Sequence, residues 1–96
     1  MSSHSLTLPS DFADYEWEVA AKGWFSEALI TVAEKQYRLN FYDSTRLGQE
    51  IESELENGRV FFEPNLVIVR SVTRAEMERA AEQLAQSGLV ASLKPE

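Results

Sequence analysis

Apolar residues alternate with polar ones over residues 15–21 and 37–41, and residues 24–33 between them carry apolar side chains; this pattern predicts three β-strands. Gly23 separates the first two stretches and Glu34 the next two, so both positions are expected to be turns. The middle stretch is apolar on both faces, which is typical of a strand with neighbours on both sides. The pattern therefore predicts a three-stranded antiparallel meander in the first half of the chain.

A narrow apolar stripe of helical spacing follows the meander. The stripe consists of Leu47, Ile51 and Leu55. Residues four positions apart share one face of a helix. Asp43 or Ser44 can cap its N-terminus by accepting a free backbone amide, and Asn57 with Gly58 can end it. We therefore expect a helix between residues 43 and 58.

The clearest local pattern is a second helix that begins after Thr73. Residues 73–76 match a capping box, in which Thr73 and Glu76 each bind a free amide of the first turn. Gly88 is suited to end this helix. Its apolar face is expected to comprise Met77, Ala80, Ala81 and Leu84.

Two uninterrupted apolar runs, residues 60–62 and 66–69, predict strands that are buried on both faces. Residues 89–93 could add a short edge strand. Together the elements predict an α+β fold, with a mostly antiparallel sheet of five or six strands and two helices packed on one face. The expected order is β-β-β-α-β-β-α, with the last strand optional. We expect residues 1–13 to form a flexible arm, with Leu6, Leu8 or Phe12 against the core, and residues 14–96 to form a single domain.

The residue inventory removes several kinds of chemistry. The chain has 96 residues, no cysteine and one histidine, His4, which lies in the expected arm. Thiolate catalysis, CxxC redox sites and zinc or copper centres are therefore disfavoured. No nucleotide-binding or hydrolase motif occurs. We expect no catalytic residue, no metal and no cofactor.

The balance of charge points away from anionic partners. The formal net charge is −7, with 16 acidic and 9 basic residues. Nucleic acids and anionic membrane surfaces attract basic proteins, so both are unlikely partners. No apolar run is long enough to span a membrane, and the N-terminal residues do not resemble a secretory signal. We expect a cytoplasmic protein.

Acidic residues are concentrated on the first predicted helix, at Glu50, Glu52, Glu54 and Glu56. Neighbours at i,i+4 repel one another there, and Arg46 can offset only one of the two repulsive pairs. These glutamates could face a basic partner. The alternative, which we favour, is a solvated helix face that keeps the chain soluble.

The outer face of the meander is a second candidate binding surface. The side chains expected to point inward are those of Tyr15, Trp17, Ile30, Val32, Leu39 and Phe41. Those expected to point outward are Glu16, Glu18, Phe25, Glu27, Leu29, Thr31, Arg38, Asn40 and Tyr42. Phe25, Leu29, Arg38 and Tyr42 would then form a mixed aromatic, aliphatic and charged surface of the kind found at protein interfaces. A partly solvated sheet with ordinary exposed apolar atoms is the alternative.

Arg70 and Arg74 flank the start of the second helix, where free amides favour an anion. They could form a weak anion site. The alternative, which we favour, is that Arg74 pairs with Glu78 and that Arg70 binds a neighbouring acid.

These features lead to three hypotheses about function. The first is a non-enzymatic protein-interaction domain that could associate with itself through its sheet. The second is an acidic inhibitor or immunity-type protein that neutralises a basic toxin or nuclease. The third is a small enzyme that uses only carboxylates and arginines, and it would need a cleft where Glu16, Glu18 or Arg38 converge.

Overall fold

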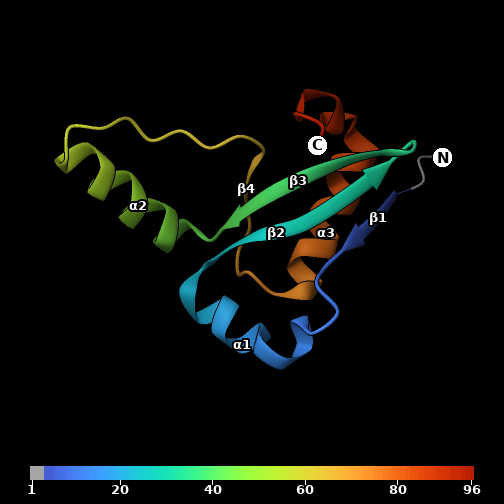
Figure 1. Cartoon of the computed structure of the whole chain (residues 1–96), viewed down its shortest axis with the longest axis horizontal. Coiled ribbons are helices and arrows are strands. Elements are labelled where there is room, and N and C mark those ends of the chain that lie inside the picture. Colours follow the sequence, from blue (N-terminus) through green and yellow to red (C-terminus); the bar gives the residue numbers. More distant parts are fainter. Residues whose placement is uncertain (1–3) are drawn as a thin grey trace.

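The computed structural model describes residues 4–96, and the first three residues of the expected arm lie outside this range. A four-stranded sheet in the order β1-β2-β3-β4 forms the centre of the molecule (Figure 1). β1 pairs with β2 and β2 with β3 in antiparallel fashion, whereas β3 and β4 are parallel. The elements are β1 (His4–Thr7), α1 (Phe12–Lys22), β2 (Trp24–Val32), β3 (Lys35–Tyr42), α2 (Ser44–Glu56), β4 (Leu66–Ile68), α3 (Arg74–Ser87) and the 3-10 helix η1 (Leu89–Ser92).

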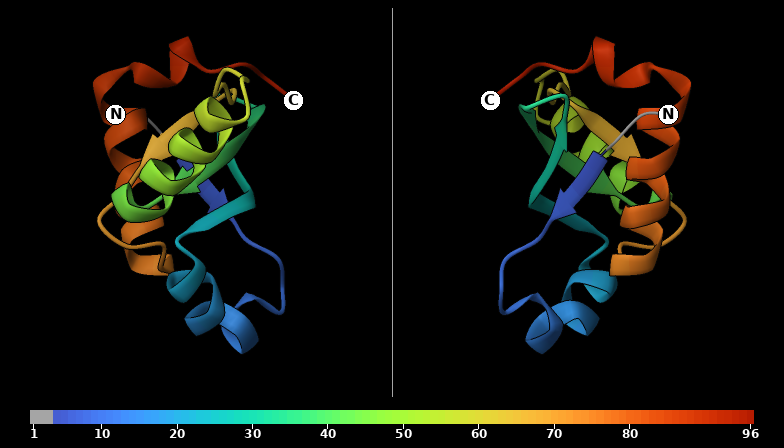
Figure 2. Two further views of the ribbon diagram at one scale, coloured as in Figure 1. Left: turned by 90° about the vertical axis from the view of Figure 1, so that its left-hand side faces the viewer. Right: turned by 90° about the vertical axis from the view of Figure 1, so that its right-hand side faces the viewer.

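One face of the sheet forms the core with α3, which lies along it (Figures 1 and 2). Ala28, Ile30 and Leu39 from the sheet and Met77 from α3 are fully buried in a single cluster. α1 lies at one end of this layer, where the rings of Phe12 and Phe25 meet edge to face with centroids 5.1 Å apart. The fold is therefore α+β, as the sequence predicted.

No helix within residues 4–96 covers the opposite face of the sheet (Figure 2). Side chains alternate along a strand, so Leu29, between the buried Ala28 and Ile30, lies on this open face. Leu29 pairs across the strands with Arg38, which is exposed. The open face results from the path of the chain between β3 and β4.

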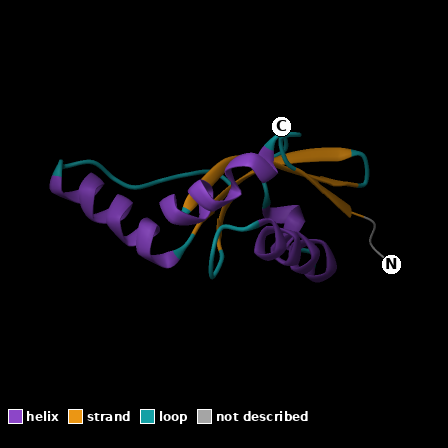
Figure 3. Ribbon diagram, turned by 90° about the horizontal axis from the view of Figure 1, so that it is seen from below, coloured by secondary structure: helices purple, strands orange, loops and turns teal. Residues whose placement is uncertain are grey.

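Parallel strands need a long crossover, which usually places a helix on a face of the sheet. Here the crossover contains α2, and α2 extends past the end of the sheet instead (Figures 1 and 3). The molecule is consequently elongated, with principal extents of 44 × 31 × 20 Å.

The prediction of five or six strands and two helices was wrong, since residues 4–96 contain four strands and three α-helices. Residues 15–21, expected to be a strand, belong to α1. Phe12 and Val19, which lie on either side of a kink at Tyr15, are both buried in the core, while Trp17, expected to point inward, is 71% exposed. The alternation there was fortuitous, because the burial of Phe12 and Val19 in the core decided the structure.

Three other segments also differ from expectation. Residues 60–62 are extended but pair with no strand, and residues 89–92 form η1 in place of an edge strand. The region assigned to an N-terminal arm contains β1 and the start of α1. Within it Leu6 and Leu8 pack against the core and Phe12 is fully buried, as the sequence indicated.

Candidate protein-interaction surface

The feature that distinguishes this fold is the part of the chain between β3 and β4, residues 44–65, which we call the projection. It consists of α2 and an extended stretch, residues 59–63, which we call the return segment because it leads back to β4. In Figures 1 and 3 the projection extends from the end of the sheet, and the return segment runs beside α2.

α2 is well formed locally but little covered by the rest of the chain. The Asp43 carboxylate accepts the backbone N–H of Arg46 at 2.7 Å, as expected for an N-cap. Along the predicted apolar stripe, Leu47 is buried, Ile51 is half-buried, and Leu55 is 61% exposed. The stripe is therefore correct as a helical pattern, but its outer end has no covering layer.

The return segment exposes apolar side chains and backbone together. Val60 is 82% exposed and Phe62 is 80% exposed. Between them Phe61 turns the other way and meets the Tyr42 ring edge to face, with centroids 6.2 Å apart. Among the described residues, the backbone amides and carbonyls of residues 60–63 have no hydrogen-bond partner. The segment therefore resembles a strand without its sheet.

Contacts at both ends hold the return segment in place. The Arg59 guanidinium donates to the two carboxylate oxygens of Glu54 at 2.7 and 3.1 Å, and the Arg59 amide donates to the Glu54 carbonyl at 2.8 Å. The side-chain hydrogen bonds from the Arg59 guanidinium lower the pKa of Glu54 below its usual range. At the other end the Tyr42 hydroxyl donates to the Glu63 carboxylate. Burial, followed by this bond, raises the pKa of Tyr42.

The acidic residues of α2 are partly neutralised within the chain. Arg46 pairs with Glu50 at 2.7 Å, and Arg59 pairs with Glu54. Glu52 and Glu56 are exposed and form no ion pair with another described residue. The four glutamates therefore do not form one uniform acidic surface, because alternate members are already paired.

The four residues predicted to form the outer sheet surface do not lie together in the structure. Leu29 and Arg38 lie together on the open face, and Arg38 pairs with Glu96 near the C-terminus at 3.1 Å. Tyr42 is buried beneath the return segment. The expected outward orientation of Phe25 was wrong: a β-bulge between Phe25 and Ala28 shifts the register, and Phe25 is buried in the core.

The predicted anion position at the start of α3 is filled from within the chain. The Glu16 carboxylate of α1 accepts the backbone N–H of Arg74 at 2.8 Å. The Arg74 guanidinium lies 5.5 Å from the centre of the Phe12 ring and 4.0 Å from Glu78, the neighbour expected from the sequence. Arg70 is exposed beside the turn into α3. The third hypothesis requires Glu16 or Arg38 to line a cleft. In the structure Glu16 instead binds the Arg74 amide, and Arg38 pairs with Glu96.

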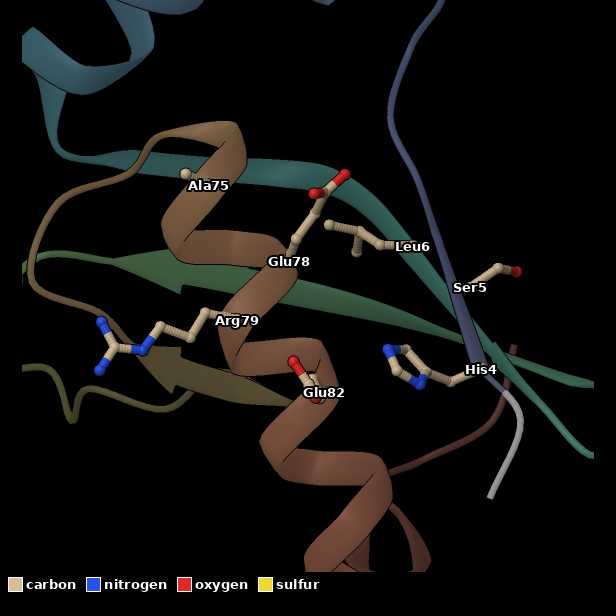
Figure 4. Close-up of a pocket in the computed structure, with 7 residues that line it drawn as sticks. All are labelled: His4, Ser5, Leu6, Ala75, Glu78, Arg79 and Glu82. Atoms are coloured by element: carbon tan, nitrogen blue, oxygen red, sulfur yellow. The ribbon is translucent and has the colours of Figure 1, made fainter. Parts of the chain in front are cut away.

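A shallow groove of about 520 Å³ runs between β1 and α3 (Figure 4). His4 points from β1 toward α3, whereas Arg79 points away from β1. Within the described residues, no three His, Cys, Asp or Glu side chains gather closely enough to hold a metal ion. Among residues 4–96, no helix is both long enough and apolar enough to cross a membrane.

Four apolar residues of the projection and of the adjoining β4 are exposed, and the sequence did not predict their exposure. They are Leu55, Val60, Phe62 and Ile68. Turn residues at Gly58 and Pro64 enclose an apolar run of three residues, and β4 is equally short. The length of the run therefore did not distinguish the return segment from a strand of the sheet.

Comparisons with protein-family models, with curated proteins and with solved structures give no match to this chain.

Proposed function

We propose that this protein is a non-enzymatic protein-interaction domain and that the projection is its binding surface. The observation that carries the proposal is the joint exposure of Val60, Phe62 and a backbone that has no hydrogen-bond partner among the described residues. The absence of cysteine fits a reducing compartment, so we propose that the partner is met in the cytoplasm.

Single exposed apolar side chains are common on protein surfaces. Exposed apolar side chains on a backbone segment without hydrogen-bond partners are less common. A strand with unpaired amides and carbonyls is a template for pairing with another chain. Recognition by strand addition uses main-chain hydrogen bonds for affinity and alternate side chains for specificity. The return segment offers both, because Val60 and Phe62 share one side of a backbone whose polar groups are free.

The outer end of the α2 stripe adds to the same surface. Leu55 precedes the turn into the return segment and is largely exposed. A partner that covered Leu55, Val60 and Phe62 would remove three large apolar side chains from water. Complete burial of a side chain of this size contributes about 1.5–3 kcal/mol.

The test is photo-crosslinking in cells that make the protein from its own gene. A benzophenone amino acid replaces Phe62, and a matched variant carries it at Trp17, which is similarly exposed but lies on α1. We expect a discrete protein adduct from position 62 and not from position 17. No adduct at position 62, or equal labelling at both positions, would refute the proposal.

A second candidate function is the neutralisation of a basic protein, which the free carboxylates of Glu52 and Glu56 favour. Association with such a partner would be fast at low salt and slower at high salt. Glu52→Lys with Glu56→Lys is the appropriate variant, because Glu50 and Glu54 serve pairs within the chain. For a partner captured at position 62, an association rate unaffected by these two changes would exclude this role.

A further inference from the structure

We infer that the partner of the return segment is a second copy of the same chain, bound antiparallel with Phe61 opposite its own counterpart. This inference rests on the proposed function and names the partner of that surface. Its basis is the sequence of residues 59–63, which is complementary to itself when reversed.

The five side chains read Arg, Val, Phe, Phe and Glu. Antiparallel pairing about Phe61 sets Arg59 opposite Glu63 of the second copy and Val60 opposite its Phe62. The twofold axis then repeats both pairs. Opposite charges and apolar pairs directly across strands are stabilising, whereas like charges opposite one another are destabilising.

Other arrangements lose this match. Moving the antiparallel register by one residue sets Arg59 opposite either Phe62 or Pro64. Parallel pairing in register sets Arg59 beside Arg59 and Glu63 beside Glu63. Moving the antiparallel register by two residues either sets Arg59 opposite Phe61 or leaves Arg59 without a partner within residues 59–63. The centred antiparallel register therefore satisfies both charged ends and both apolar pairs.

The free backbone has the length that this pairing requires. The Arg59 amide is already bonded to the Glu54 carbonyl, and Pro64 has no N–H and gives its carbonyl to the Asn40 side chain at 2.7 Å. These two residues bound the unbonded groups of residues 60–63. In a ladder centred on Phe61, Val60 of one copy and Phe62 of the other can exchange their backbone hydrogen bonds, which uses groups within that stretch and does not disturb the bonds on either side.

The end charges are available although each has a partner within its own chain. The Arg59 side chain is more than half exposed, and a guanidinium has five N–H donors, so it can keep Glu54 and reach a second carboxylate. Glu63 accepts the Tyr42 hydroxyl with one oxygen and leaves the other free. The acidic end of one copy can thus meet the basic end of the other.

Charge reversal tests the pairing directly. In Arg59→Glu both ends of the twofold pair become Glu against Glu, and in Glu63→Arg both become Arg against Arg. We expect each variant alone to dimerise at least tenfold more weakly than wild type in sedimentation equilibrium. An equimolar mixture should form a heterodimer, seen by native mass spectrometry, because both end pairs are again complementary. Circular dichroism confirms that each variant is folded.

A matched control reverses charges outside the segment. Arg79→Glu and Glu82→Arg change exposed residues on α3, outside the projection. Neither should alter the dimer as the first pair does, and mixing them should rescue nothing. Restoration of dimer by the control mixture to the same extent would show a general charge effect and overturn the inference.

The natural absence of cysteine allows a second measurement that does not depend on charge. Directly paired antiparallel residues have Cα atoms about 4.5–5.5 Å apart, within the range that a disulfide spans. Oxidation of mixed Val60→Cys and Phe62→Cys proteins should therefore give a disulfide-linked dimer at least fivefold faster than either variant alone. Equal rates would overturn the proposed register.

The outcomes separate this inference from the proposed function. A chain that stays monomeric at all concentrations, and whose position 62 captures a different protein in cells, overturns self-pairing and leaves the proposed function standing. A chain that neither dimerises nor captures anything at position 62 overturns both. A crosslinked species of twice the mass of the chain, together with rescue on mixing, supports both.

Discussion

Gly23, which ends α1, provides a stringent test of the fold because two independent constraints act on it. Its φ is +80°, a left-handed conformation, and a Cβ added to it would lie 2.6–2.8 Å from the Asp43 carboxylate. That carboxylate caps α2. In Gly23→Ala the left-handed conformation costs about 1–2 kcal/mol, and displacement of the cap costs about 1 kcal/mol more.

The loss of about 2–3 kcal/mol is a large part of the 5–15 kcal/mol typical of a whole domain. Urea denaturation followed by tryptophan fluorescence measures it, with an expected decrease in midpoint of about 1–3 M. Gly58→Ala is the matched control, since Gly58 has φ +73° but no atom within 4 Å of an added Cβ. It should cost about 1 kcal/mol less than Gly23→Ala.

A double-mutant cycle identifies the clash itself. If the added methyl acts on Asp43, then Gly23→Ala should cost about 1 kcal/mol less in an Asp43→Ala background, because the cap is already gone. Equal costs for Gly23→Ala and Gly58→Ala, or no coupling between residues 23 and 43, would refute the reasoning.

Three further predictions concern caps, turns and pH. Thr73 accepts the amide of Glu76, so Thr73→Ala should lower the free energy of unfolding by about 1 kcal/mol in urea denaturation, while Thr73→Ser should stay near wild type. Ala33 and Glu34 both have positive φ (51° and 69°) in the β2–β3 turn, so replacing them with Asn and Gly should raise the melting temperature, with a gain of about 1 kcal/mol. Because Arg59 lowers the folded-state pKa of Glu54, the stabilisation from this pair is present above the usual glutamate pKa of about 4.3 and is lost as pH falls through the lower folded value. Glu54→Gln should therefore be less stable than wild type at pH 7 in urea denaturation, and the two should converge in acid; a constant difference across pH would contradict the pairing.

Elements with local signals could be predicted from the sequence. α2 and α3 begin at the capping residues Asp43 and Thr73, because a side-chain oxygen that satisfies a free amide acts within one turn. β2 and β3 follow the alternation of apolar residues, and the turn between them was correctly placed. These signals do not depend on what lies elsewhere in the chain.

The predictions of secondary structure and burial were wrong where contacts between distant parts of the chain determine the structure. Residues 15–21 fit both a strand and a helix, and the helix prevailed because Phe12 and Val19 together reach the core. Phe25 changed faces through a bulge that no residue pattern announces. Residues 60–62 were expected to be buried because apolar runs usually are, and sequence alone does not show that no neighbouring strand exists to bury them.

The open sheet face and the exposed projection have a common physical cause in the sequence of α2. A crossover helix that covers a sheet needs a wide apolar face, but α2 has only the narrow stripe of Leu47, Ile51 and Leu55 between charged residues. The open face in turn presents Gln36, Arg38 and Asn40, which gain little from being covered by an apolar surface. Neither surface therefore drives α2 back onto the sheet, and only Leu47 at its base is buried. The apolar atoms of Leu55, Val60 and Phe62 remain exposed for the same reason, so another chain, and not a rearrangement of this one, is the expected way to cover them.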